Sequence, residues 1–431
     1  RLVRFNSSTS QGEATVSGSA EPYGIEGLPL LEARNKILAA LKPTQKTETV
    51  ALNQALGRIN AEPVVAPEAI PGFRASVMDG YALGQQTQPQ QGDQWTLQGR
   101  SAPGAPFQGS LSPGEAIRIL TGAPLPPGAG WVLPQELVCT QDTELSLEGN
   151  ASDNPWIRAA DEECKAEDCL LDPGQRLTPA LLGRLASCGI AQLLVYQQPR
   201  IGLIISGDEL VPAGTTRPPG TIWESNGTLL IALIQTLGQK VEHHCVVADE
   251  PQALRQTLQD LSKQCDVVVS TGGVSAGDSD WIRPLVAELG AVEFWKLFLK
   301  PGRPFAFGSL GDGVPFFGLP GNPVAAAITA IQLLWPALQT IEGQTTPELF
   351  PRVRVELADQ LQRRPGRPEL ARAQLDVGSS GQLLARLHGS QASSRIGSLN
   401  GADLLLELPA EAEDLKPGEQ LWAQMIRRAV F

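Results

Sequence analysis

The stretch from Asp266 to Gly290 limits the fold of this chain more than any other. An apolar, β-branched run after Asp266 breaks at Thr271-Gly272-Gly273, and the helical pattern WIRPLVAELG begins at Trp281. This order predicts a buried parallel strand, a tight turn and a helix. The glycines leave backbone N–H groups open to an anion, and the helix N-terminus adds partial positive charge. The stretch therefore predicts phosphate-like chemistry, and not dinucleotide binding, because G-x-G-x-x-G is missing.

The glycine turn is followed by residues that suit a metal-bridged anion: Ser275, Asp278 and Asp280. Carboxylates at such a junction hold a divalent cation that bridges to the bound anion. Asp249, in the segment ADEPQAL, is a third candidate ligand, although capping of the next helix explains it equally well. We expect Mg²⁺ to be held by Asp249, Asp278 and Asp280.

Residues 198–346 alternate between apolar strands and helical segments, which predicts a doubly wound α/β domain. Glu209 directly follows the strand IGLIIS, at the strand end where open α/β sheets bind ligands. Ser225 or Asn226 is a plausible N-cap for the helix that follows. Asn322 and Pro323 begin another helix, either as its ordinary cap and first residue or as a second anion-facing N-terminus.

A basic turn, Lys300-Pro301-Gly302-Arg303-Pro304, follows the run EFWKLFL. The rigid Pro-Gly pair fixes the spacing of two cations, of which Arg offers a bidentate fork and Lys a point charge. We interpret the turn as an oxyanion site because the chain is acidic and has few other close basic pairs in such rigid contexts. Both residues lie in a turn, so we expect their replacement to leave the fold intact.

The remaining chain is too long to share one core with this domain. We predict a polar tail at 1–23, a helical elongated region at 24–63 and 166–197, and an inserted β-domain at 64–165. The helical region is inferred from apolar spacing in LPLLEARNKILAAL, TVALNQALGRINA and LTPALLGRLASCGI. Five short strand-like segments in 347–431 predict a β-barrel-like C-terminal domain.

Composition excludes several functional classes. The formal net charge of −12 argues against a nucleic-acid partner. No run of 18 apolar residues is present, so we expect no membrane association. The six cysteines form no C-x-x-C pair, and no His lies near Cys164 or Cys169, which argues against zinc. Reduced, packed thiols indicate a cytoplasmic protein.

Seven motifs resemble, in order, those of the MoeA/gephyrin E-domain family, the molybdopterin molybdenumtransferases. The resemblance covers roughly residues 24–428. Related adenylyltransferases and CinA-like proteins share the GDEL and GGVS elements, whereas MDGYA, KPGRP and the C-terminal β-domain are more specific. The motifs are MDGYA (78–82), TGAPLPPGA (121–129), SGDELV (206–211), GTIWESN (220–226), STGGVSAGDSD (270–280), KPGRP (300–304) and GLPGNPVAAA (318–327).

The resemblance implies insertion of molybdate into the dithiolene of adenylylated molybdopterin, with release of AMP and with Mg²⁺ as cofactor. It implies a homodimer whose clefts are shared between subunits, and transient contact with molybdopterin adenylyltransferase and molybdoenzyme chaperones. Arg303 stands where the family often has Lys, Ser206 where it usually has Thr, and Ala159-Ala160-Asp161 where it has Gly-Glu-Asp. The implied catalytic residues are Asp79, Thr121, Glu209, Asp249, Lys300 and Arg303, and the substrate-binding residues are Asp161, Gly272, Gly273, Ser275, Pro320, Asn322, Pro323, Arg372 and Ser390 or Ser394.

Two other functions share part of this pattern. A molybdopterin adenylyltransferase would have the α/β domain but would need neither residues 24–197 nor 347–431. A molybdopterin-binding scaffold would expose a groove for a partner. Release of AMP from adenylylated molybdopterin in the presence of molybdate distinguishes these alternatives.

Overall fold

The computed structural model describes residues 27–273 and 281–427. Their contacts divide the chain into two compact units. The first contains the described residues up to Glu48, Gly57–Ile59 and those from Tyr196 onward. The second contains Thr49–Leu56 and Asn60–Val195.

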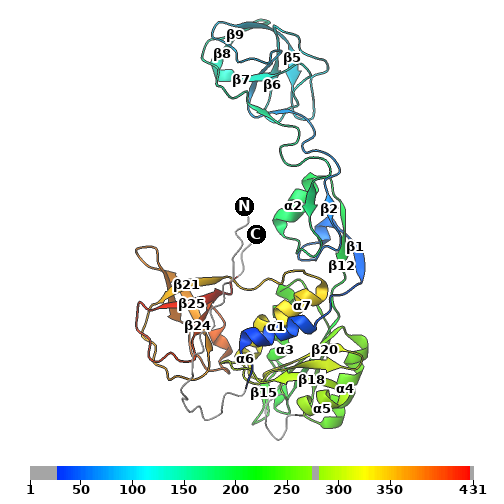
Figure 1. Ribbon diagram of the computed structural model, residues 1–431, viewed down its shortest axis with the longest axis vertical. Coiled ribbons are helices and arrows are strands. Elements are labelled where there is room, and N and C mark those ends of the chain that lie inside the picture. Colours follow the sequence, from blue (N-terminus) through cyan, green and yellow to red (C-terminus); the bar gives the residue numbers. More distant parts are fainter. Residues whose placement is uncertain (1–26, 274–280, 428–431) are drawn as a thin grey trace, which may run out of the picture. The chain divides into compact units, whose positions relative to one another are not determined.

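A six-stranded mixed sheet forms the centre of the first unit (Figure 1). Its strand order is β16-β13-β17-β20-β19-β18, with parallel pairing from β16 to β20 and antiparallel pairing at the β19 and β18 edge. Every residue of β13 and β17 is buried, as expected for parallel strands covered on both faces. The strands are β13 (Ile201–Ser206), β16 (Val241–Val247), β17 (Val267–Thr271), β18 (Gly290–Trp295), β19 (Ala306–Leu310) and β20 (Val314–Leu319).

Helices cover both faces of this sheet, which confirms the α/β class. Leu203 and Ile205 pack into one hydrophobic cluster with the helices α1, α3, α6 and α7, whereas Ile204 packs into the other with α4 and α5. The alternation follows from the two-residue period of a strand. The helices are α1 (Leu30–Ala40), α3 (Asn226–Thr236), α4 (Pro251–Gln264), α5 (Ile282–Leu289), α6 (Pro323–Thr329), a π-helical segment (Ala330–Leu334) and α7 (Trp335–Glu342).

Helix α1 belongs to the first unit, and not with residues 166–197 as the sequence pattern suggested. Its buried residues, Ala33 and Ile37, join the same cluster as the sheet and α6–α7. Figure 1 shows the blue α1 beside the yellow helix. Helical spacing predicted the helix but contained no information on which core its apolar face covers.

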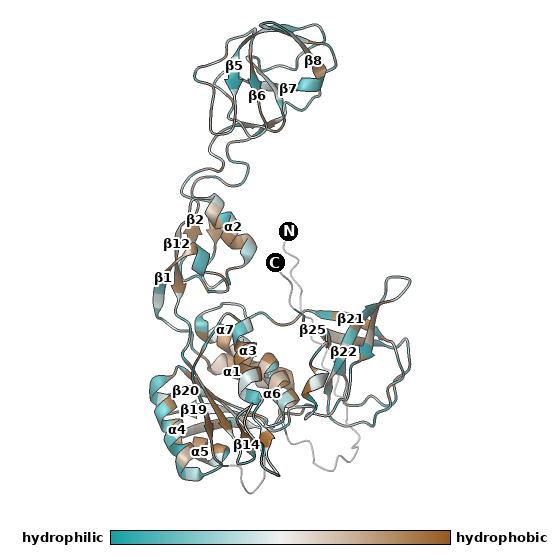
Figure 2. Cartoon of the chain, turned by 180° about the vertical axis from the view of Figure 1, so that it is seen from behind, coloured by the Kyte–Doolittle hydropathy of each residue, from teal (hydrophilic) through white to brown (hydrophobic). Residues whose placement is uncertain are grey.

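One continuous helix, Pro323–Glu342, is long and apolar enough to cross a membrane by length and composition among the described residues. Its apolar window is 94% buried inside the protein. Figure 2 shows the hydrophobic colouring of this helix and of strands β19 and β20. The helix therefore serves as core of the first unit.

Five strands close into a barrel after this helix, as the sequence predicted. Their order is β21-β23-β22-β24-β25, and their inward side chains form a separate core. The strands are β21 (Arg352–Leu357), β22 (Glu369–Val377), β23 (Leu383–Leu387), β24 (Leu404–Leu408) and β25 (Gln420–Met425).

The second unit combines helix α2 with a six-stranded sheet of order β7-β4-β6-β5-β9-β8. Thr178 caps α2 through its hydroxyl, and Gly189 follows the helix with a left-handed φ of 77°. The segment 49–61, predicted as helical, is instead a strand, a short 3₁₀ helix and a turn, because three of the four residues Thr47–Val50 are β-branched. The elements of this part are β1 (Thr47–Ala51), β2 (Val64–Val65), β3 (Ala75–Ser76), β4 (Gly80–Leu83), β5 (Gln94–Ser101), β6 (Glu115–Ile119), β7 (Trp131–Pro134), β8 (Val138–Gln141), β9 (Glu144–Leu147), β10 (Ile157–Arg158), β11 (Cys169–Leu171), α2 (Pro179–Ser187) and β12 (Gln192–Tyr196).

Candidate active site

A pocket of about 1250 Å³ opens in the first unit where β13, β17 and β20 end. Ser206, Thr271 and Pro320 line it from these three strand ends. Parallel strands bring their carboxyl ends to one edge of a sheet, so segments more than 40 residues apart meet there. Residues of the barrel complete the wall, among them Arg367, Gln391 and Ser394.

The acidic side of the pocket is built after β13. The Ser206 hydroxyl donates to the carboxylate of Asp249, and the Asp249 N–H donates to Asp208 Oδ1 at 3.0 Å. These bonds fix Asp249 at the pocket, where Glu209 also lies. The N-cap of α4 is Glu250, so Asp249 does not cap that helix.

Asn226 fastens three chain segments at this edge. Its Nδ2 donates to Thr271 Oγ1 at 3.0 Å and to the Gly321 carbonyl at 2.8 Å. The Thr271 hydroxyl in turn donates to the Pro320 carbonyl at 2.8 Å. Ser225 occupies the N-cap position of α3 without a side-chain cap bond, and Glu224 accepts the Gly227 N–H instead. Asn226 is therefore a positioning residue and not the helix cap.

The glycine turn after β17 leaves no room for a side chain. Gly272 has a φ of 89°, and a Cβ there would lie 2.3 Å from the Ser206 carbonyl oxygen. Gly272 and Gly273 line the pocket, whereas Ser275, Asp278 and Asp280 lie outside the described residues. Within 27–273 and 281–427, no group of three or more His, Cys, Asp or Glu side chains is arranged to hold a metal.

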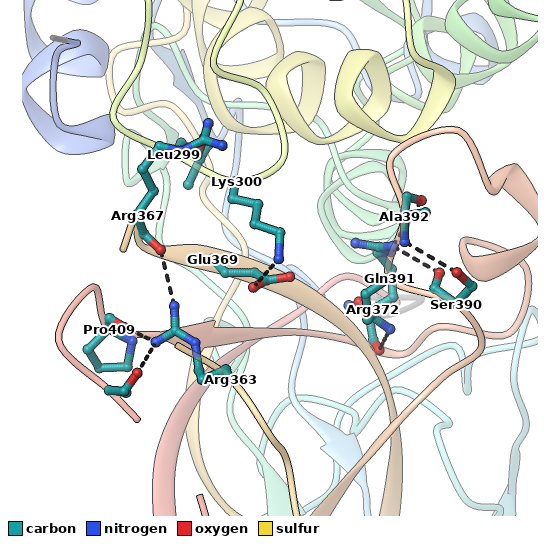
Figure 3. A network of polar contacts seen from close by, with 11 residues as sticks. Leu299, Lys300, Arg363, Arg367, Glu369, Arg372, Ser390, Gln391, Ala392 and Pro409 are labelled. Atoms are coloured by element: carbon teal, nitrogen blue, oxygen red, sulfur yellow. Dashed lines mark hydrogen bonds and ion pairs between the residues drawn. The ribbon is translucent and has the colours of Figure 1, made fainter. Parts of the chain in front are cut away.

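The basic turn lies at the same pocket, on the side of the barrel. Lys300 and Arg303 both line the pocket. Lys300 Nζ donates to Glu369 Oε2 on β22 at 2.9 Å (Figure 3), and the Lys300 N–H donates to the Pro368 carbonyl at 2.8 Å. The ammonium is half exposed while the carboxylate is buried, so this pair joins the α/β domain to the barrel.

A second basic turn was missed in the sequence. Arg364-Pro365-Gly366-Arg367-Pro368 repeats the pattern of 300–304, and a search for that pattern would have found it. Arg367 lines the pocket and donates through Nη1 to the Leu299 carbonyl at 3.0 Å, as Figure 3 shows. The chain therefore has a second rigid basic pair, contrary to the prediction that such pairs are few, and this pair contacts Leu299, the residue directly before the first turn.

Arg372 is fully buried on the outer face of β22, because its neighbours Ala371 and Ala373 face the barrel core, and it does not line the pocket. Its Nε donates to Ser398 Oγ at 3.1 Å and its Nη2 to the Ser390 carbonyl at 3.2 Å. Gln391 bonds to the Arg372 backbone in both directions (Figure 3). Burial lowers the pKa of the guanidinium from its ordinary value. The structure thus places Arg372 behind the 390–398 loop, which it holds.

Two serines of the 390–398 loop line the pocket. They are Ser393 and Ser394, whereas Ser390 does not line the pocket. The Ser393 carbonyl accepts the Val324 N–H at 3.1 Å, so the barrel occupies the first free N–H of α6. Pro320, Asn322 and Pro323 line the pocket, and Asn322 is the N-cap residue of α6 without a side-chain cap bond.

Three predicted residues belong to the second unit. Asp79 Oδ1 accepts the Thr121 N–H at 2.8 Å and the Thr121 hydroxyl at 2.7 Å. The backbone bond, followed by the hydroxyl bond, lowers the pKa of Asp79. Asp161 is exposed. Asp79 and Thr121 therefore form one local site.

Three successive regions of the chain match models of known protein domains. Residues 202–340, which contain the pocket's strand ends, match the probable molybdopterin binding domain. Residues 28–189 match the MoeA N-terminal region (domain I and II), and residues 354–423 match the MoeA C-terminal region (domain IV). The three matches follow the order of the domains along the chain.

Known proteins match this chain in sequence and in structure over more than nine-tenths of its length. The chain is 33% identical to molybdopterin molybdenumtransferase of Haemophilus influenzae, over 91% of this chain and 97% of that protein. It is 32% identical to the molybdenum cofactor synthesis protein cinnamon of Drosophila melanogaster, over 96% of this chain and 68% of that protein. The crystal structure of the molybdopterin biosynthesis MoeA protein from Pyrococcus horikoshii OT3 superimposes with a TM-score of 0.79 at 25% identity, over 93% of this chain and 100% of that one. The chain belongs to the MoeA family of molybdopterin molybdenumtransferases, and is a transferase.

Proposed function

We propose that this chain inserts molybdate into the dithiolene of adenylylated molybdopterin and releases AMP, the last step of molybdenum cofactor biosynthesis. Family membership supports the reaction. The observation that carries it is the pocket itself, which Lys300 and Arg303 line together with Gly272 and Gly273 at the end of a parallel strand. A cationic turn suits a tetrahedral dianion, and exposed backbone N–H groups suit phosphate oxygens.

The roles of the pocket residues follow from their donors. Arg303 and Lys300 supply charge-assisted hydrogen bonds to the molybdate oxygens, with Arg367 and the Ser394 hydroxyl beside them. Gly272 and Gly273 allow the phosphoanhydride to approach the backbone. Glu209 and Asp249 form the acidic wall that faces this phosphate end.

Magnesium fits the donor set on this acidic wall. Mg²⁺ prefers one or two carboxylates together with waters and substrate phosphates, and Asp249 is a fixed carboxylate at the pocket. Asp249 would hold the ion; Asp278 and Asp280, the other two predicted ligands, lie outside the described residues. When bound, Mg²⁺ neutralises charge on the phosphoanhydride as it is cleaved.

We further propose a cytoplasmic homodimer with shared clefts. All six cysteines are free thiols, which suits a reducing compartment. Asp79 and Thr121 belong to the second unit and the basic turn to the first, and a two-fold pair would let one subunit supply each. Transient contact with molybdopterin adenylyltransferase or with molybdoenzyme chaperones would deliver the substrate and accept the product.

The adenylyltransferase alternative leaves most of the chain unexplained, because residues 28–189 and 354–423 match MoeA regions outside the α/β domain. A scaffold role is compatible with catalysis and does not replace it.

The test is release of AMP from adenylylated molybdopterin by the purified chain, with and without molybdate. Arg303→Gln should raise the molybdate requirement roughly ten- to a hundredfold, the loss expected for one charge-assisted contact. Arg354→Gln removes an exposed arginine of the barrel strand β21 and is the matched control. Molybdate-independent turnover, or an Arg303→Gln variant with unchanged molybdate dependence, would refute the proposal.

A further inference from the structure

Trp223 is an exposed aromatic side chain whose position at the pocket is fixed. It lies on β15 (Ile222–Trp223), which pairs with β14 (Leu210–Val211) just after the acidic turn. The indole is 51% exposed, yet its Nε1 donates to the Thr215 carbonyl at 3.0 Å. The ring therefore has its polar group satisfied and its orientation set before any ligand arrives.

Arg217 covers one face of this ring. Its guanidinium carbon lies 5.2 Å from the ring centroid, and its Nη1 donates to the Thr221 carbonyl at 3.1 Å. A cation over one face supports the ring and adds positive charge at the pocket rim. About half of Trp223 remains exposed, which leaves ring surface for another planar group.

Among the described residues that line the pocket, Trp223 is the only aromatic one. The other side chains there are charged, hydroxyl-bearing, amide, aliphatic or proline. The substrate of the proposed function carries two flat heteroaromatic systems, the adenine and the pterin. Such rings stack favourably on an exposed aromatic face.

We propose that Trp223 is the stacking platform for a planar heteroaromatic ring of the ligand, and so orients adenylylated molybdopterin with its anionic groups toward the glycine turn and the basic turn. This inference rests on the proposed function, because that function supplies the rings. Trp223 acts in binding and takes no part in bond cleavage. Two ring systems share this chemistry, and separate probes identify which one it receives.

Calorimetric titration of the full chain tests the platform with three probes: AMP, ribose 5-phosphate and 6-hydroxymethylpterin. Trp223→Leu should weaken binding of AMP or of the pterin on the order of tenfold, the usual cost of losing one stacked base. Trp223→Phe should retain most of that affinity. Ribose 5-phosphate, which has no base, should bind all three forms equally.

Trp422 provides the matched control, because it is also exposed and carries Arg352 and Arg354 over its ring but lies on β25, away from the pocket. Trp422→Leu should change none of the three titrations. The platform is refuted by unchanged AMP and pterin binding in Trp223→Leu, by equal loss of ribose 5-phosphate, or by an unaltered chain that binds neither ring. AMP release by the unaltered chain is measured separately, so a failed platform and a failed transferase give different results.

Discussion

Lys300 and Glu369 differ in exposure, and this makes their ion pair asymmetric. The lysine side chain is 51% exposed and the glutamate side chain 7%. Removal of Glu369 leaves an ammonium that water can solvate, whereas removal of Lys300 leaves a buried carboxylate without its partner. Replacement of Lys300 should therefore lower the stability of the fold, although a residue in a turn was expected to be replaceable without that loss.

We expect Lys300→Met to lower the free energy of unfolding by about 2 kcal/mol and Glu369→Gln by about 1 kcal/mol. The double variant should be more stable than the sum of the single changes predicts, because it leaves no buried charge. Urea denaturation of the three variants and the parent chain measures this cycle. Equal cost for the two single changes would contradict the asymmetry.

Cys265 is a buried thiol that should be unreactive in the native protein at pH 8. Burial raises its pKa to about 11, although Arg200 acts in the opposite direction. A raised thiol pKa keeps the unreactive protonated form, so at pH 8 about one Cys265 thiol in a thousand is thiolate. Iodoacetamide at pH 8 should label the exposed Cys169 in the native protein and reach Cys265 only after denaturation. Peptide mass spectrometry reads both sites, and native labelling of Cys265 as fast as that of Cys169 would contradict this account.

One buried side chain, that of Arg372, holds both ends of the 390–398 loop. Arg372 on β22 bonds to the Ser390 carbonyl and to Ser398, and Ser393 and Ser394 between them line the pocket. Arg372→Met should destabilise the barrel by about 2–4 kcal/mol, because a buried hydrogen-bond network is lost.

The same substitution should loosen the loop before the barrel unfolds. Arg395 is an exposed trypsin site within it, so cleavage there should accelerate at least several-fold, with a matching loss of AMP release. Arg354→Met, on the solvent face of β21, should change neither rate. Normal resistance at Arg395 in Arg372→Met would show that the loop holds its conformation without the guanidinium.

Elements were predictable where the signal is local. Strands β13, β17 and β20, each followed by its turn and helix, follow from apolar runs and glycines within about 25 residues, and the five barrel strands from alternation. Contacts between domains were not predictable. The Lys300–Glu369 pair and the Ser393–Val324 bond each span 69 residues, and no periodicity encodes which loop meets which turn. The substrate-binding role of Arg372 came from the family resemblance, whereas Arg367 and Trp223 were not assigned at all.

At the scale of the whole molecule, the proposed roles divide between the two units. Asp79 and Thr121 belong to the second unit and Arg303 to the first. The second unit of a chain supplies Asp79 and Thr121 either to the pocket of the same chain or to the pocket of a partner chain. Complementation between two inactive chains distinguishes these cases, because a shared site can be rebuilt from one healthy unit of each.

With molybdate held too low for the Arg303→Gln variant, we expect Asp79→Ala and Arg303→Gln to be nearly inactive when purified separately. Unfolded and refolded together in equal amounts, they should recover about a quarter of the parental AMP release measured at the same molybdate concentration. The fraction follows from two-fold symmetry: about half of the pairs are mixed, and each mixed pair has one intact site and one doubly altered site. Light scattering should give the mass of two chains before and after mixing. Refolding each variant alone is the control for recovery by refolding itself. A fully active monomer, or a mixed dimer without recovered activity, would show that Asp79 and Arg303 serve the site of one chain.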